Sequence, residues 1–158
     1  MTHGNFILHD REYNAFLAIL KKLLSDSYAK VVFLIDKNGS MLASSGETGE
    51  FDTTSIASLA AGNIAATGGL ASLIGEKEFS ILFHEGEKDN MHISVIGNRL
   101  ILVVIFDKRS SVGLVRLRVR RASADLQTVL ASVDSRAQSE GQGGIEELTE
   151  DDIESLFK

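Results

Sequence analysis

The sequence contains no cysteine, no proline and no tryptophan. The absence of cysteine excludes disulfide bonds, thiol catalysis and cysteine-bound metal, and it agrees with a reducing compartment. The longest uninterrupted apolar stretch is residues 100–106, whereas a membrane-spanning helix needs about 20 apolar residues. The N-terminal residues show no basic segment followed by an apolar one, so we expect no secretory signal. These absences predict a cytoplasmic protein without direct membrane insertion.

The length of 158 residues predicts one domain that buries a core without covalent staples. The formal net charge of −6 is unevenly distributed along the chain. Residues 145–158 contain six acidic residues and one lysine, for a net charge of −5, which leaves −1 for residues 1–144. Because the body is nearly neutral and the tail is acidic, we expect no nucleic-acid partner.

Two helices and a hairpin are predicted in the first half of the chain. Asp10 is a candidate N-cap, and the apolar residues that follow it have helical spacing. Residues 30–36 and 40–44 resemble strands, and Asn38-Gly39 between them is a strong hairpin signal because both residues tolerate positive φ. Residues 53–74 are rich in alanine and lack proline, which predicts a second helix despite several glycines.

The second half predicts three strands and one long helix. The strands cover residues 79–85, 91–96 and 99–106, and the helix covers residues 111–133 with a regular apolar seam. The first and last strands of the chain are apolar nearly throughout, which predicts central positions in the sheet. The expected fold is therefore α+β, a five-stranded antiparallel sheet with helices on both faces in the order α-β-β-α-β-β-β-α.

Three segments follow from this division. Residues 1–133 form the folded domain, residues 134–144 form a flexible linker rich in serine, glutamine and glycine, and residues 145–158 form an acidic amphipathic docking helix. In the domain, the strand at 79–85 is a hydrophobic edge, which favours pairing with a second copy of the chain. The residues that we assign to dimerisation are Phe79, Ile81 and Phe83.

Several segments in this order resemble the Roadblock family, and within it the regulators of bacterial cell polarity and motility. The resemblance covers roughly residues 12–133 and the tail, and it is carried by residues 30–39, 52–63, 68–76, 83–86, 102–107, 111–118 and 151–157.

The resemblance implies a Roadblock/longin-like fold and a homodimer in which third strands join the two sheets and second helices lie side by side. It also implies one partner per dimer, an MglA-like small Ras-like GTPase in its GTP form. The family members in question stimulate GTP hydrolysis without inserting an arginine finger, and they gather in clusters at cell poles.

A row of small residues marks the second helix as the candidate GTPase-binding surface. Ala57, Ala61, Ala65 and Gly69 recur every fourth residue, with Gly68 beside the last. Such a row lets another backbone approach closely. The alternative is that this row packs on the sheet of its own subunit. The larger apolar residues on other faces of the helix, which are Ile56, Leu59, Leu70 and Leu73, are expected to fill the core.

No catalytic residue and no cofactor are predicted. The glycine pair at 68–69 matches neither the phosphate-binding loop nor the dinucleotide fingerprint, so the chain itself should bind no nucleotide. Arg116 and Arg120 are four residues apart and are expected on a solvated helix face rather than as an arginine finger. His84 and His92 are expected on the same face of the sheet, but no third ligand converges on them, so we predict no metal.

The tail holds a second candidate contact. Leu148, Ile153, Leu156 and Phe157 give residues 145–158 an apolar stripe beside the acidic residues, as in a peptide that folds into the groove of a partner. The alternative is a solvated, disordered tail.

Taken together, these patterns predict a regulator that stimulates a GTPase and is not itself an enzyme. A Roadblock adaptor or scaffold that binds a GTPase or motor component without activating it is the alternative, and the rate of hydrolysis separates the two. A ligand-sensing domain would need an internal polar pocket, against which the apolar central strands argue.

Overall fold

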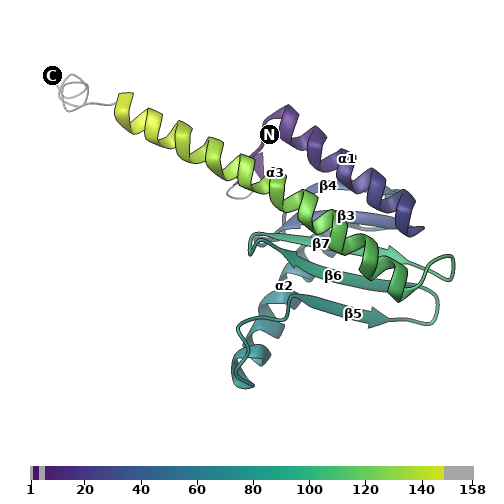
Figure 1. The fold of residues 1–158 in the computed structure, drawn as a ribbon. Helices are drawn as coiled ribbons and strands as arrows, with labels where there is room; N and C mark the ends of the chain where they lie inside the picture. The colour runs from purple at the N-terminus through teal and green to yellow at the C-terminus, as the bar shows by residue number, and fades with distance from the viewer. Residues whose placement is uncertain (1, 4–5, 148–158) are drawn as a thin grey trace.

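The computed structural model describes residues 2–3 and 6–147. Helices cover both faces of a five-stranded antiparallel sheet, which gives three layers in all (Figure 1). The elements, in chain order, are β1 (Thr2–His3), β2 (Phe6–Ile7), α1 (Asp10–Ser27), β3 (Val31–Asp36), β4 (Met41–Gly46), a short 3₁₀ turn (Thr48–Glu50), α2 (Thr53–Leu73), β5 (Ile81–Glu85), β6 (Asn90–Ile96), β7 (Leu100–Phe106) and α3 (Val112–Glu147). The predicted order of helices and main strands is confirmed. The small β1–β2 hairpin was not predicted.

The main sheet has the strand order β4-β3-β7-β6-β5, and every neighbouring pair is antiparallel. The two strands predicted as central, β3 and β7, pair directly, and all of their residues are buried. Their continuous apolar sequences follow from this position, because each of these strands faces a helical layer on both sides. β5 forms one edge of the sheet.

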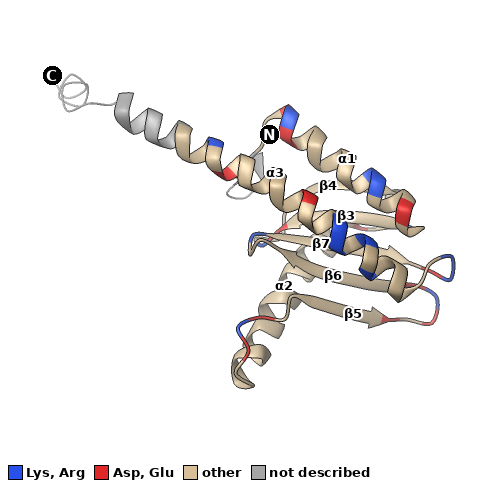
Figure 2. Cartoon of the chain, viewed as in Figure 1, with Lys and Arg blue, Asp and Glu red and all other residues tan. Residues whose placement is uncertain are grey.

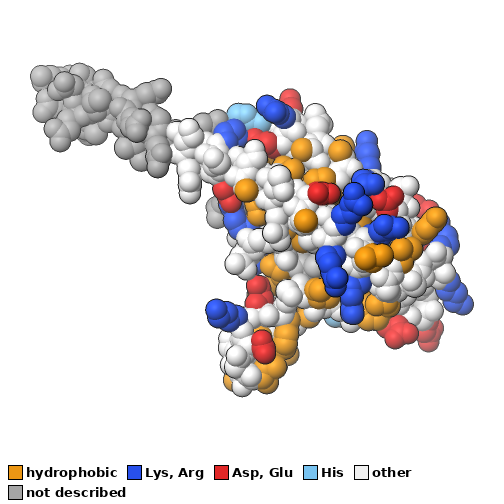
Figure 3. Space-filling model, in the orientation of Figure 1, with side chains coloured by type: hydrophobic (Ala, Val, Ile, Leu, Met, Phe, Trp, Pro, Cys, Tyr) orange, Lys and Arg blue, Asp and Glu red, His pale blue; other side chains and the backbone are white. Residues whose placement is uncertain are grey.

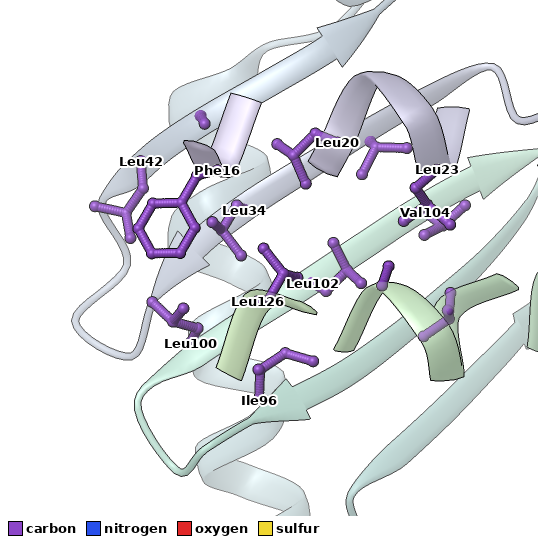
Figure 4. Close-up of a cluster of buried hydrophobic side chains, with 14 of the residues drawn as sticks. Phe16, Leu20, Leu23, Leu34, Leu42, Ile96, Leu100, Leu102, Val104 and Leu126 are labelled. Atoms are coloured by element: carbon purple, nitrogen blue, oxygen red, sulfur yellow. The ribbon is translucent and has the colours of Figure 1, made fainter. Parts of the chain in front are cut away.

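The sheet separates two hydrophobic clusters. Alternate residues of β3 and β7, such as Leu34 and Leu102, face α1 and α3, where they pack with Phe16, Leu20 and Leu126 (Figure 4). The residues between them, such as Phe33 and Val103, face α2. The first cluster is the larger one, and it anchors both α1 and α3 to the sheet.

A partly buried ion pair joins the start of α1 to α3. The Arg136 guanidinium donates to Glu12, with Nε 2.6 Å from Oε1 and Nη2 3.1 Å from Oε2. Glu12 also contributes to the N-terminal capping box of α1, whose N-cap is His9. The structure therefore places the cap one residue before Asp10, which is the first residue of the helix.

Helix α3 is longer than the sequence predicted. It continues from Val112 to Glu147, through residues 134–144 that we expected to form a flexible linker, so the predicted end at Val133 is wrong. The segment lacks proline and contains alanine, glutamine, glutamate and arginine, which all favour helix, while each glycine costs only about 1 kcal/mol relative to alanine. The composition of residues 134–144 suggested that serine and glycine would prevent a helix, which they do not.

The Asn38-Gly39 turn between β3 and β4 positions α2. One Asp36 carboxylate oxygen accepts hydrogen bonds from the backbone N–H groups of Asn38 and Ser40, at 2.9 and 3.0 Å. Gly39 has φ +90°, and a Cβ at this position would lie 3.3 Å from the Cα of Ser58 in α2. Glycine is therefore required both for the turn and for the close approach of the helix.

Candidate protein-interaction surface

Helix α2 carries no charged residue from Thr53 to Leu73. It begins at a strong N-cap, since Asp52 accepts hydrogen bonds from the backbone N–H and the hydroxyl of Ser55, at 3.1 and 2.7 Å. These bonds lower the pKa of Asp52 and keep its carboxylate charged at the positive end of the helix dipole.

By length and hydropathy α2 could cross a membrane, and it is the one helix in the described part of the chain that could. The uninterrupted apolar runs of the sequence did not predict this, because serine, threonine, asparagine and glycine interrupt the apolar residues of α2. A helix that meets the same criteria also occurs in soluble proteins, so the finding alone is weak evidence for a membrane span.

Most of α2 lies outside the core. Ala57, Ala60 and Ile64 are buried against the sheet. The side chains of Leu59, Leu70 and Leu73 are 73%, 59% and 82% exposed. The prediction that these three leucines fill the core is therefore wrong. The turn at Gly39 holds α2 so close to the sheet that only small side chains fit between them near Ala57.

The predicted row of small residues turns around the helix. Ala57 is buried against the sheet, Ala61 and Gly68 are half-buried, and Ala65 and Gly69 are exposed. A step of four residues advances by about 40° beyond a full turn, so a long row cannot stay on one face of a straight helix. The packing alternative is correct at Ala57, whereas Ala65 and Gly69 lie on the outer side.

Nothing in the described subunit requires the glycines near the end of α2. A Cβ placed on Gly68 or Gly69 would have no neighbour within 4 Å. Glycine in a helix interior costs about 1 kcal/mol relative to alanine, so an open position offers no compensation within the subunit. A second chain that approaches α2 closely at these positions would explain why glycine occurs there.

Strand β5 adds a hydrophobic edge. Ile81 and Phe83 point to the α3 side of the sheet, yet they are 46% and 36% exposed. Phe79 lies before the strand and is half-buried. The edge position of β5 also leaves backbone groups along one side free to pair with another strand.

These features leave a large apolar area open. Figure 1 shows the C-terminal end of α2 projecting past β5, and Figure 3 shows hydrophobic side chains gathered along this projection. We call the exposed residues Leu59, Ala65, Gly69, Leu70 and Leu73 the α2 surface. Apolar patches of this kind mark sites of protein contact.

The two predicted histidines lie on opposite faces of the sheet. Phe83 pairs with His92, and His84 pairs with Met91, whereas a shared face for the two histidines requires Phe83 opposite Met91 or Ile93. His84 faces α2, where its Nε2 is 3.4 Å from the amide Nδ2 of Asn63, and His92 lies under α3. The expectation of a shared face is wrong, because a shift by one residue reverses every side chain. Among the described residues no three potential ligands gather around a metal position.

The arginines of α3 lie on the face of the sheet opposite α2. Arg116 and Arg120 are exposed, as predicted, in the part of α3 that carries most of the positive charge in Figure 2. Arg109 is held by Asp107, whose carboxylate accepts from Nε at 3.0 Å. The predicted docking residues Leu148, Ile153, Leu156 and Phe157 lie outside the described residues.

Comparison with known proteins agrees with the fold. The Roadblock/LC7 domain model matches residues 16–106, and the chain belongs to this family. Within it the chain is an MglB-like protein, because it is 51% identical to Myxococcus xanthus MglB, with 81% of this chain and 96% of that chain covered and a TM-score of 0.77.

Two further solved structures support this placement. The gliding protein MglB of Thermus thermophilus is 30% identical, with coverage of 81% and 97% and a TM-score of 0.76. A structure described as MglB with tetrameric arrangement is 28% identical, with coverage of 84% and 99% and a TM-score of 0.79. No match was found among curated protein sequences.

Proposed function

We propose that this protein is a homodimeric GTPase-activating protein for an MglA-like small Ras-like GTPase in a cytoplasmic circuit of cell polarity and motility. The observation that carries the proposal is the α2 surface, an uncharged helix with exposed leucines in a chain that is 51% identical to MglB. A helix of this length without charge needs a protein cover to be stable in water.

The dimer would form through β5 and the neighbouring part of α2. Pairing of two β5 edges would join the sheets, and it would cover Ile81 and Phe83, which the single subunit leaves exposed. The open space at Gly68 and Gly69 would let the two α2 helices approach closely. Two α2 helices side by side then form one face large enough for a single GTPase.

The activator would act by binding rather than by supplying a catalytic group. Arg116 and Arg120 belong to α3, which covers the face of the sheet opposite α2 (Figure 1), so neither lies on the proposed GTPase-binding surface. A dimer that binds the hydrolysis-ready arrangement of the GTPase more tightly than other arrangements raises the population of that arrangement. The enzyme is then the GTPase, and this chain is its regulator.

The proposal is tested by substitutions that add bulk to the α2 surface. Ala65→Arg or Gly69→Arg should abolish acceleration of GTP hydrolysis by an MglA-like GTPase, with the circular dichroism spectrum unchanged. Ala131→Arg is the matched control, because Ala131 is an exposed alanine in α3 on the other face of the sheet. Normal activation by both α2 variants would overturn the proposal, and binding without acceleration by the wild type would identify an adaptor.

A further inference from the structure

A groove lies on the face of the sheet opposite α2. It runs between the N-terminal half of α3 and strands β5 and β6, with a volume of about 330 Å³. We call it the α3–β6 groove. The described residues that give the groove its chemistry are His92, Ser94, Arg116, Val119, Arg120 and Ala124.

The charge of the α3–β6 groove is one-sided. Arg116 and Arg120 lie one helical turn apart on its rim, and none of its described lining residues is acidic. Neither arginine forms an ion pair with a described residue. The groove between α1 and α3 differs, because Asp26 and Asp125 lie beside its cations. Figure 3 shows lysine and arginine side chains gathered over this part of α3.

The floor of the groove contains buried polar groups without partners. Both ring nitrogens of His92 and the hydroxyl of Ser94 are buried and make no hydrogen bond within the described chain. A buried polar atom that lacks a partner destabilises the folded chain until a ligand supplies one. Burial, and then the charge of Arg116, lower the pKa of His92, so the ring is neutral and offers one donor and one acceptor. The floor is thus complementary to a ligand with polar groups.

We propose that the α3–β6 groove binds residues 148–158 of another copy of this chain. This segment contains Glu150, Asp151, Asp152 and Glu154 against the single Lys158, a net charge of −3. Its apolar residues Ile153, Leu156 and Phe157 match the apolar part of the groove, where Val119 and Ala124 of α3 lie. Opposite charge around an apolar centre is the usual pattern of a helix or peptide in a groove.

The length of α3 determines that the segment comes from another copy. From Arg120 to Glu147 the helix spans about 40 Å at about 1.5 Å per residue. The last acidic residue, Glu154, lies seven residues beyond Glu147 and reaches at most about 25 Å from it at about 3.6 Å per residue. While α3 is intact, the acidic residues of the tail cannot reach Arg116 or Arg120 of their own chain.

The absence of native cysteine makes a direct test possible. Full-length Ser123→Cys, which places the thiol on the groove, is mixed with full-length Ser155→Cys under mild oxidation, without any GTPase. We expect a disulfide between the two variants. Asn14→Cys is the matched control, because Asn14 is exposed on α1 outside the groove, and it should give only background cross-linking.

Charge reversal distinguishes this docking from random collision. Arg116→Glu with Arg120→Glu in the groove partner should reduce cross-linking about tenfold, and Asp151→Lys with Asp152→Lys in the tail partner should restore it. Salt should weaken the wild-type cross-link. Any of three results would overturn the proposal. The cross-linking could equal that of Asn14→Cys, or it could be insensitive to both charge reversals. The disulfide could also form within one chain that carries both cysteines at low protein concentration. Because no GTPase is present, this outcome is independent of the proposed GTPase activation.

Discussion

The two faces of the sheet are built in different ways. On one face, α1 and α3 cover a cluster of 19 buried hydrophobic residues and present charged side chains to solvent. On the other face, α2 packs through alanines and two isoleucines, Ile56 and Ile64, and it exposes three leucines and no charge. The first face completes a large core within one subunit, whereas the second leaves most of its helix for another protein to cover. The difference separates the residues that hold the fold from those available for binding.

The largest expected effect lies on the complete face. Leu126→Ala should lower the free energy of unfolding by about 3 kcal/mol, because Leu126 is fully buried between α3 and the sheet. Leu117→Ala in the same helix should change it by less than about 0.5 kcal/mol, because that side chain is 55% exposed. Urea unfolding at one protein concentration checks the pair, and equal losses would contradict the assignment of the core.

The ion pair between α1 and α3 should give the next largest effect. Arg136→Ala leaves the Glu12 carboxylate, whose side chain is 10% exposed, without its bidentate partner. We expect a loss of about 2 kcal/mol, below the cost for fully buried pairs because Arg136 is itself 21% exposed.

The double variant Glu12→Gln with Arg136→Ala tests this reason. It should recover part of the lost stability, because no uncompensated charge remains. A double variant that is less stable than Arg136→Ala would show that packing of the two side chains, rather than charge, holds this contact.

The β5 edge should respond in association rather than in folding. Ile81→Lys places a charge on the β5 edge and should weaken self-association about tenfold, as light scattering over a dilution series would show. Ile81→Val is the conservative control. A dimer that is insensitive to Ile81→Lys would place the contact elsewhere.

The smallest expected effect is a pH dependence under α3. The folded state lowers the pKa of His92, so below the ordinary pKa of histidine the unfolded chain binds more protons than the folded one. Stability should therefore fall as the pH decreases from 7 to 5. His92→Gln should flatten this dependence in urea titrations at each pH. An unchanged slope would mean that other groups cause the loss.

The sequence predicted the architecture well, because hydrophobic periodicity and turn residues are local signals. The continuous apolar sequences of β3 and β7 predicted the centre of the sheet, and the Asn38-Gly39 turn predicted the β3–β4 hairpin. The end of α3 was missed because its glycines and serines resemble a linker, although a helix can absorb their cost.

The candidate surface could be predicted only in part. The uncharged sequence of α2 was visible, but which side chains it exposes depends on how closely the helix approaches Gly39. Leu59, Leu70 and Leu73 were assigned to the core for this reason. The register of β5 on β6, which separates His84 from His92, depends on pairing between strands and cannot be read from alternation alone.

The most direct test of the incomplete face is GTP turnover by an MglA-like GTPase at saturating concentrations of wild type, Gly69→Arg and Ala131→Arg. The account predicts strong acceleration by the wild type and by Ala131→Arg, and the unstimulated rate with folded Gly69→Arg. Equal acceleration by all three proteins would contradict it, because a GTPase bound to the α2 surface could not tolerate the arginine.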